Sequence, residues 1–549
     1  MAAVSTSKRD FSFELKPQHQ PFHANPHVTA CKGLTIENVA QSRSIAGPLP
    51  LSVAASTSSD NYKSVSCYQH PKAKSWKHRF TREAMLRGPT RLRALATVTA
   101  NPGLITLGSG RPSSEYFPFE EIQVKIPKPP YFLDQEATKG IAITTGKYDT
   151  RHGLSSYDLA LSLNYSHGAG SPQLLRFVTE HTEIVHHPPY SDWECCLTAG
   201  NTSGLDMVFR MFCKPGDHVL MEDYTYSGTL EAAYPLGIHI TGVRMDQNGL
   251  SATHLDEMLT DWDTSPGSAT KPSLLYMIPT GQNPTGVTQS LTRRREVYAV
   301  AEKHDIYIIE DDPYYFLQMG KYQEHAVEKS AVFNPELVGH FLSKLLPSYL
   351  SLDISGRVLR LESTAKILAP GLRCAWLTAS SEVVQRFLYH QDVSTVQPSG
   401  VSQLIMYKVL DEAWGHEGFF QWLMYLRHEY SKRRDIIIQA CEEYLPRDIC
   451  QWQRPEAGMF LWIELQWRKH PLVKKGGIGK QDLEERIFRE AVNRGVLYCQ
   501  GSWFRAGEEI GDRMFLRTTF SAAPLGDVQK AIERLGSTLK SARMKSYVA

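Results

Sequence analysis

Short apolar runs alternate with helical patterns between about residues 165 and 380, and this alternation constrains the fold more than any other feature. Helical patterns occupy 202–213, 289–304 and 381–390. Six runs have the length and composition of buried strands: 193-WECCLT-198, 218-HVLME-222, 238-IHITGV-243, 274-LLYMI-278, 306-IYIIE-310 and 375-AWLTA-379. Strands and helices that alternate at this spacing form a largely parallel sheet with both faces covered. The sequence therefore predicts an α/β fold.

The composition changes along the chain, and these changes predict its domains. Residues 1–80 are rich in Ser, His, Pro, Gln and Asn without a sustained helical or strand period, so we expect a mostly disordered extension. A plain solvated tail is favoured over a targeting or contact arm. Residues 81–150 should form an N-terminal arm and part of a small domain. Residues 151–400 should form the large domain, and the long amphipathic stretches of 401–549 should complete the small domain as α+β structure.

Charge and cysteine content narrow the range of partners. Sixty basic and fifty-eight acidic residues give a net charge of +2, so we expect no nucleic-acid partner. No run of eighteen apolar residues occurs, so we expect no membrane span. The nine cysteines include no C-x-x-C pair, which favours reduced thiols and a cytoplasmic location, with organellar targeting by the extension left open. The expected partners are small molecules, and no metal site is predicted.

The stretch 363-STAKILAPGLR-373 fixes one amine beside a hydroxyl and a guanidinium. Lys366 follows a probable strand at 357–363 and precedes an Ala-Pro-Gly turn that would hold the chain in place. A lysine fixed in this way could form an imine with pyridoxal phosphate, and Ser363 and Arg373 would then hold the phosphate. A surface turn explains the stretch as well, so the other motifs decide between the two interpretations.

Three further motifs lie at the ends of predicted strands. In 198-TAGNTSGL-205 a strand passes into a helix, whose first backbone N–H groups could bind a phosphate together with the side chains of Asn201, Thr202 and Ser203; an ordinary capped helix is the alternative. In 279-PTGQNPTG-286 the amide of Asn283 would reach over a ligand at the carboxyl edge of the sheet. In 309-IEDDPYYF-316 one of two carboxylates could pair with a protonated pyridine nitrogen.

The four motifs follow one another over about 170 residues, and their combination resembles a known family. Through TAGNTSGL, YMIPTGQNPTG, IIEDDPYYFLQM, the Lys366 segment and 516-LRTTFS-521, the chain resembles the fold type I pyridoxal-phosphate-dependent aminotransferases. Within them it is similar to the fungal aromatic amino acid and 2-aminoadipate (kynurenine) branch. The resemblance covers roughly residues 80 to 545 and implies a large cofactor-binding domain with a mainly parallel sheet and a smaller α+β domain from both termini.

The resemblance implies a role for each matching residue at the cofactor. Lys366 would carry pyridoxal 5′-phosphate and move the proton of the 1,3-shift. Asp311, rather than its neighbour, would pair with the pyridine nitrogen, and Tyr314 and Asn283 would donate to the ring 3-oxygen. Tyr226 would stack on the ring. The phosphate would be held by Asn201, Thr202, Ser363 and Arg373.

The resemblance also implies the residues that meet the substrate. Arg517 would bind the α-carboxylate bidentately, assisted by Asn283. Tyr165 would line the site near the boundary of a homodimer, and Gly110 would approach the substrate.

Three departures from the family pattern affect the site. Ala365 stands where the family's usual Ser-x-Ser-Lys has its second serine, which removes one phosphate-binding hydroxyl. Asn-Thr-Ser at 201–203, in place of Ser-Gln-Gln, favours the aromatic subgroup. The family's Gly-Gly-Leu-Pro is Gly-Ser-Gly-Arg-Pro here, so Arg111 could meet the substrate and act with Arg93 as a second cation for an acidic substrate.

The resulting expectation is an enzyme that moves the α-amino group of an aromatic amino acid to a 2-oxo acid, 2-oxoglutarate or phenylpyruvate, by ping-pong chemistry. A 2-aminoadipate/kynurenine-type or pathway-dedicated aminotransferase is the first alternative. A cofactor-dependent lyase or synthase and a cofactor-sensing regulator are further alternatives, and the regulator is disfavoured because the N-terminal extension has no helix-turn-helix pattern.

Overall fold

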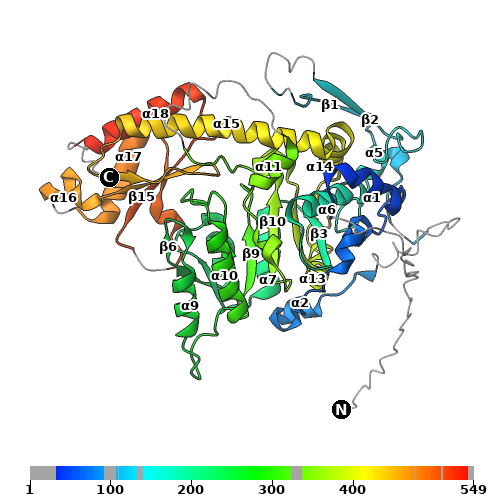
Figure 1. Cartoon of the computed structure of the whole chain (residues 1–549), viewed down its shortest axis with the longest axis horizontal. Coiled ribbons are helices and arrows are strands. Elements are labelled where there is room, and N and C mark those ends of the chain that lie inside the picture. The colour runs from blue at the N-terminus through cyan, green and yellow to red at the C-terminus, as the bar shows by residue number, and fades with distance from the viewer. Residues whose placement is uncertain are drawn as a thin grey trace, which may run out of the picture. The chain divides into compact units, whose positions relative to one another are not determined.

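The computed structural model describes residues 33–91, 107–108, 110–130, 132, 140–322, 337–476, 478–507 and 511–541. Its centre is a seven-stranded sheet in the order β3-β11-β10-β9-β8-β4-β5 (Figure 1). Neighbouring strands run parallel except where β11 pairs with β3 and β10. The strands are β3 (Trp193–Thr198), β4 (His218–Glu222), β5 (His239–Val243), β8 (Leu274–Met277), β9 (Tyr307–Asp311), β10 (Val358–Ser363) and β11 (Ala375–Ser380). The predicted α/β fold is confirmed.

The middle of this sheet is buried on both faces. Every residue of β8, β9, β10 and β11 is buried. Because successive side chains of a strand point to opposite faces, both faces must be covered, and this explains why these strands read as continuous apolar runs. The covering helices include α6 (Pro172–His186), α7 (Asn201–Phe212), α8 (Ser227–Ala233), α9 (Ala252–Thr260), α10 (Leu291–Lys303) and α13 (Ser381–Gln391).

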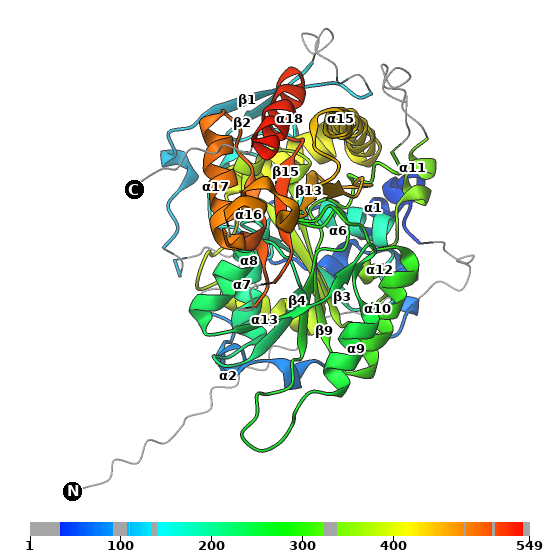
Figure 2. The same ribbon diagram turned by 90° about the vertical axis from the view of Figure 1, so that its left-hand side faces the viewer.

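A second, antiparallel sheet of four strands lies in the C-terminal part of the chain, in the order β12-β13-β15-β14 (Figure 2). Helices α17 and α18 contribute Leu483 and Leu535 to the apolar cluster that this sheet shares. Its elements are β12 (Cys450–Trp452), β13 (Phe460–Leu465), β14 (Cys499–Gln500), β15 (Met514–Thr519), α17 (Lys480–Asn493) and α18 (Leu525–Lys540). The C-terminal part of the chain therefore combines an antiparallel sheet with packed helices.

The long helix α15 (Gly415–Tyr444) joins the two apolar clusters. Phe420, in its first part, is buried in the cluster of the large sheet, whereas Ile438 is buried in the cluster of the second sheet. Helix α14 (Gly400–Tyr407) also packs in the large cluster. The large unit therefore extends past the boundary predicted at residue 400.

Residues 33–80 are folded, so the prediction of a disordered extension is wrong for them. The segment includes α1 (Val39–Ala46) and several short 3-10 helices, and it is followed by α2 (Arg82–Leu86). Its apolar side chains join the large cluster: Leu34, Tyr62, Cys67, Trp76 and Phe80 are buried there. The sequence concealed this because the apolar residues are widely spaced and their partners lie more than a hundred positions away. Residues 1–32 are outside the described residues.

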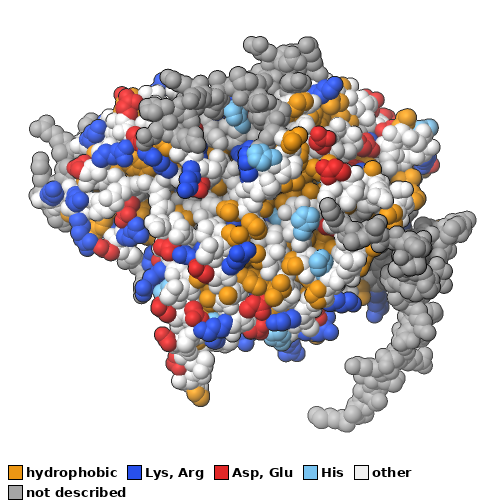
Figure 3. Space-filling view, viewed as in Figure 1, with side chains coloured by type: hydrophobic (Ala, Val, Ile, Leu, Met, Phe, Trp, Pro, Cys, Tyr) orange, Lys and Arg blue, Asp and Glu red, His pale blue; other side chains and the backbone are white. Residues whose placement is uncertain are grey.

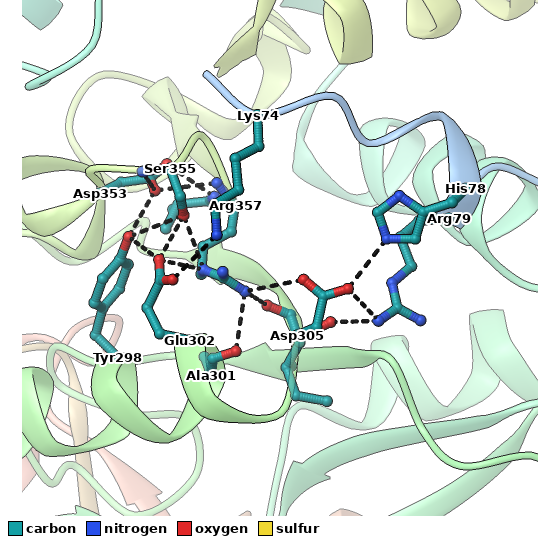
Figure 4. A network of polar contacts seen from close by, with 12 residues as sticks. Lys74, His78, Arg79, Tyr298, Ala301, Glu302, Asp305, Asp353, Ser355 and Arg357 are labelled. Atoms are coloured by element: carbon teal, nitrogen blue, oxygen red, sulfur yellow. Dashed lines mark hydrogen bonds and ion pairs between the residues drawn. The ribbon is translucent and has the colours of Figure 1, made fainter. Parts of the chain in front are cut away.

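Residues 71–81, here called the strap, are fixed to the starts of β9 and β10 by a polar network (Figure 4). Arg79 Nη2 donates to the carbonyl and to Oδ2 of Asp305, at 2.6 and 2.7 Å, just before β9. Arg357, just before β10, is fully buried, and its Cζ lies 5.1 Å from the Trp76 ring centroid. The strap therefore anchors the two strands that carry the acid and lysine motifs.

The hairpin of β1 (Glu121–Ile126) and β2 (Ile141–Gly146) belongs with the large unit. Ile126 is buried in the large cluster, and Val124 and Ile143 are partly buried against it. The prediction that this region forms part of the small domain is therefore wrong for the hairpin.

The face shown in Figure 3 has basic and acidic side chains interspersed, with apolar side chains between them, in keeping with the net charge of +2. Within the parts of the chain that the structure describes, no helix has both the length and the apolar character needed to cross a membrane.

Candidate active site

The four sequence motifs meet at one edge of the large sheet. Strands β3, β8, β9 and β10 run parallel, so their carboxyl ends lie together, and each of the four motifs is at such an end. Ligands of open α/β sheets bind at this edge. Topology alone therefore brings together segments that are up to about 170 residues apart.

Asp311, the last residue of β9, is 7% exposed and accepts two hydrogen bonds. Asn201 Nδ2 donates to its Oδ1 and the Tyr276 hydroxyl to its Oδ2, both at 2.7 Å. Burial raises the pKa of Asp311, while these two hydrogen bonds and the charges of Arg360 and Lys366 oppose the rise. Sequence reasoning missed Tyr276; its signal was a lone hydroxyl in the otherwise apolar run of β8.

Asp312 contacts a different set of side chains from those that contact Asp311. Its Oδ2 accepts from Thr280 Oγ1 at 2.9 Å and lies 3.4 Å from Arg360 Nη1, in fully buried surroundings. Burial raises the pKa of Asp312 to about 7, against the charges of Arg360 and Arg294. Of the two adjacent carboxylates, Asp311 is therefore the one that lies with Asn201 and Tyr276.

Lys366 ends a 3-10 turn, Thr364–Lys366, directly after β10. Ser363 caps this turn by accepting from the Ala365 N–H at 3.1 Å, and Thr364 Oγ1 donates to the Cys374 carbonyl at 2.5 Å. Lys366 is half-buried. The turn thus sets the lysine at the carboxyl edge of the sheet.

Two guanidiniums lower the proton affinity of this amine. Burial lowers the pKa of Lys366, the positive charges of Arg517 and Arg373 lower it further, and Asp311 opposes them. A larger fraction of the amine is therefore unprotonated near neutral pH than for a solvent-exposed lysine.

Arg517 reaches the site from the second sheet. Its Nη1 donates to Asn283 Oδ1 at 2.8 Å. Asn283, which is buried, also hydrogen-bonds the Tyr314 side chain, and burial raises the pKa of Tyr314 well above its ordinary value. Asn283 therefore links an arginine of one sheet to the Asp-x-x-Tyr motif of the other.

Gln282 fixes the loop that carries Asn283. Its Nε2 donates to Glu222 Oε2 at 2.9 Å and to the Tyr224 carbonyl at 2.6 Å. Its Oε1 accepts from the N–H and the hydroxyl of Thr285 at 2.9 and 2.7 Å. All four hydrogen bonds of the amide restrict the backbone beside Asn283. Sequence reasoning missed this role.

The phosphate cup is only partly assembled by direct contacts. Gly200 has φ +103°, and a Cβ there would lie 2.1 Å from Arg373 Nη2, so glycine is required for this close approach. Arg373 donates to the carbonyls of Ala199 and Pro370 at 3.3 and 3.1 Å. Thr202 is exposed in the first turn of α7.

For the remaining predicted residues, the structure shows no direct contact with Lys366 or Asp311 among the described residues. Tyr226 is 36% exposed and lies directly before α8. Tyr165 is 55% exposed, and no atom of the described residues lies within 4 Å of where a Cβ of Gly110 would be. Arg111 Nη1 donates to the Val53 carbonyl at 3.0 Å, which uses one of its five N–H donors. Arg93 lies outside the described residues.

Comparison with known proteins identifies the family. The family model for aminotransferase class I and II matches residues 163–535, more than half of the chain. The chain belongs to the class I and II aminotransferases. The aminotransferase swnA of Metarhizium robertsii is 41% identical over 485 residues, which cover 85% of this chain and 92% of that relative.

Two further comparisons cover nearly all of the related protein. An aromatic amino acid aminotransferase of Schizosaccharomyces pombe is 38% identical over 459 residues, covering 82% of this aminotransferase and 94% of the relative. The crystal structure of aminotransferase Aro8 from Candida albicans superposes with a TM-score of 0.78 at 35% identity, covering 86% of this chain and 99% of that chain. The predicted fold type I aminotransferase is confirmed, and this chain is a pyridoxal-phosphate-dependent enzyme.

The residues present fit that cofactor. Within the described residues, neither Arg373 nor Arg517 pairs with a carboxylate, and the buried Oδ1 of Asn201 has no hydrogen-bond partner. Two uncompensated cations beside one amine suit ligands that carry a phosphate and a carboxylate. The aminotransferase thus has two positions that can bind an anion, one at the start of α7 and one at the second sheet.

Proposed function

We propose that this aminotransferase moves the α-amino group of an aromatic amino acid to a 2-oxo acid, 2-oxoglutarate or phenylpyruvate, in a ping-pong cycle. The observation that carries the proposal is the position of the Arg517 guanidinium beside two aromatic rings. Its guanidinium Cζ lies 4.6 Å from the ring centroid of Phe460 and 4.5 Å from that of Phe504. Two aromatic rings therefore lie beside the α-carboxylate position, and apolar surface next to a site suits an aromatic substrate better than an acidic one. The S. pombe relative's name supports the same substrate class.

The cofactor supplies an electron sink that lets the α C–H bond of the amino acid break. Lys366 is the residue that would hold it, and its Nζ, once freed by the amino group of the substrate, would move the proton of the 1,3-shift. The depressed pKa of Lys366 favours this work, because the amine must accept a proton near neutral pH. Asp311 would hold the proton on the ring nitrogen.

Other side chains would orient the two reactants. Asn283 and Tyr314 would donate to the ring oxygen, and Tyr226 would cover the ring. Ser363 would donate its hydroxyl proton to the phosphate, because in the described part of the chain its oxygen accepts from the Ala365 N–H and donates to no other group. Arg517 would bind the α-carboxylate and so direct the α C–H bond toward Lys366.

A panel of amino donors tests the substrate class. Phenylalanine, tyrosine, tryptophan, 2-aminoadipate, kynurenine and aspartate are each offered with 2-oxoglutarate and with phenylpyruvate, and kcat/KM is measured from the oxo acid formed. We expect the three aromatic acids to exceed aspartate by at least tenfold, roughly the value of one mismatched polar group. A preference for 2-aminoadipate or kynurenine would replace the aromatic assignment with the alternative branch.

We also propose that the enzyme is a homodimer and is located in the cytoplasm. The exposed Tyr165 supports the first part, because a site-lining tyrosine with 55% exposure in one chain is available to a second copy. Sedimentation of the holoenzyme tests the dimer, and a Tyr165→Ala variant tests whether this surface takes part. Imaging of the tagged full-length chain tests the location.

A further inference from the structure

The register of the second sheet places a cysteine directly beside the carboxylate-binding arginine. Strand β15 lies between β13 and β14, and Arg517 on β15 is paired with Cys499 on β14. Side chains directly opposite each other on neighbouring strands point to the same face and touch. The neighbourhood of Cys499 and Arg517 is thus fixed by the backbone ladder.

Four groups hold the Arg517 guanidinium. Its Nη2 donates to Cys499 Sγ at 3.0 Å, and its Nη1 donates to Asn283 Oδ1 at 2.8 Å. The rings of Phe460 and Phe504 lie against it at 4.6 and 4.5 Å. The rings restrict tilting of the guanidinium plane, and the two acceptors restrict its rotation within that plane.

The chemistry of the acceptor matters as much as its position. A thiol sulfur is a weak acceptor, so it orients an N–H without compensating the positive charge. An aspartate at the same place would form an ion pair with Arg517 and compete with the substrate. In the described part of the chain, no carboxylate pairs with Arg517, so its charge stays available.

We propose that Cys499 is a positioning residue for Arg517: its sulfur sets the orientation of the guanidinium toward the substrate α-carboxylate while leaving the charge uncompensated. This inference rests on the proposed role of Arg517. Because Cys499 acts on substrate binding rather than on proton transfer, its loss raises KM and leaves kcat nearly unchanged.

The test uses the holoenzyme with four variants of one position. Cys499→Ala and Cys499→Val remove the acceptor, the second while keeping a side chain of similar volume that suits a strand. Cys499→Ser restores an acceptor, and Cys499→Asp adds a charge. Cys213→Ala is the matched control, since Cys213 is also half-buried but follows the opposite end of α7 from the site.

Two probes separate carboxylate binding from general damage. The inhibition constant is measured for 3-phenylpropionate, which carries the carboxylate, and for its neutral amide, alongside kcat and KM for phenylalanine. We expect Cys499→Ala and Cys499→Val to raise the inhibition constant of 3-phenylpropionate and the KM for phenylalanine by about 3- to 10-fold, which is the effect of losing one hydrogen bond. The inhibition constant of the amide should stay unchanged in all variants. Cys499→Ser should recover most of the lost affinity for 3-phenylpropionate, and Cys499→Asp should weaken that affinity by roughly 30-fold or more.

The outcomes distinguish this inference from the function on which it rests. If both acceptor-free variants keep the wild-type inhibition constant and KM while Arg517→Met raises them, Cys499 has no positioning role and the proposed function stands. If Arg517→Met itself leaves both unchanged, the role of Arg517 is wrong. A loss in kcat at constant KM, or an equal loss for the amide, also overturns the inference.

Discussion

The Tyr276 hydroxyl on β8 donates to Asp311 Oδ2 on the neighbouring strand β9 at 2.7 Å. Both residues are buried, and Asn201 donates to the other carboxylate oxygen, so the acid has one donor for each oxygen. Within this group, burial favours the protonated acid and the two donors favour the carboxylate. The balance between these effects sets the pH range in which Asp311 is a negatively charged carboxylate.

Removing one donor should shift that balance. Tyr276→Phe deletes a hydrogen bond that lowers the pKa of Asp311, so this already raised pKa rises further. Since the proposed role needs the carboxylate form, the acid limb of kcat should move to higher pH. The measurement is kcat from pH 5 to 9. Tyr307→Phe is the control, because the buried Tyr307 hydroxyl has no partner within the described residues; identical profiles for both variants would contradict the prediction.

Replacing Asp311 should mainly affect catalysis, whereas replacing Asp312 should mainly affect stability. Asp311→Asn should lower kcat by about 100-fold or more, as loss of a pre-organised charge in a buried site does, with little change in stability. Asp312→Asn should lower the free energy of unfolding by about 1–3 kcal/mol, because Thr280 and Arg360 lose a buried carboxyl oxygen as their partner, and should affect kcat less. Steady-state kinetics and urea unfolding check both. Equal losses of kcat would mean that the acids share one role.

Replacing Lys366 should abolish turnover without weakening the fold. Lys366→Met removes an ammonium that burial, Arg517 and Arg373 all disfavour. Because the folded-state pKa lies below the unfolded value, wild-type apoenzyme is penalised at low pH and gains stability as pH rises between the two values. The variant apoenzyme should therefore be at least as stable as wild type at pH 7, by thermal unfolding. Borohydride reduction and peptide mapping of wild type should label Lys366; a label on another lysine would refute the assignment.

The strap should contribute to the stability of the catalytic strands. Trp76 is 1% exposed, so Trp76→Ala should cost about 3–5 kcal/mol and lower the thermal midpoint of the holoenzyme. Lys74→Ala is a control from the same segment, because this side chain is 60% exposed and its ion pair with Glu302 is 3.5 Å long. A midpoint that falls equally little in both variants would show that the strap packs without stabilising the enzyme.

The strand end points show how much of the site was predictable from the sequence. Strand runs and turn residues are local features, and parallel strands necessarily bring their carboxyl ends to one edge. For this reason local pattern is enough to place Asn201, Asp311 and Lys366 together, and strand alternation is enough to separate Asp311 from Asp312.

Tertiary structure alone decided the contacts that tune these residues. Tyr276, Gln282 and Cys499 act on their neighbours through side-chain contacts, and nothing local in the sequence marks which residues they meet. Cys499 meets Arg517 only because two strands of a separate sheet pair in one register. Residues 33–80 likewise lack a local period, and they are folded because their scattered apolar side chains find partners in the large core. Local pattern thus determined which strands of the large sheet form and where they end, whereas burial and hydrogen bonding depend on residues distant in the chain and became defined only when the elements packed.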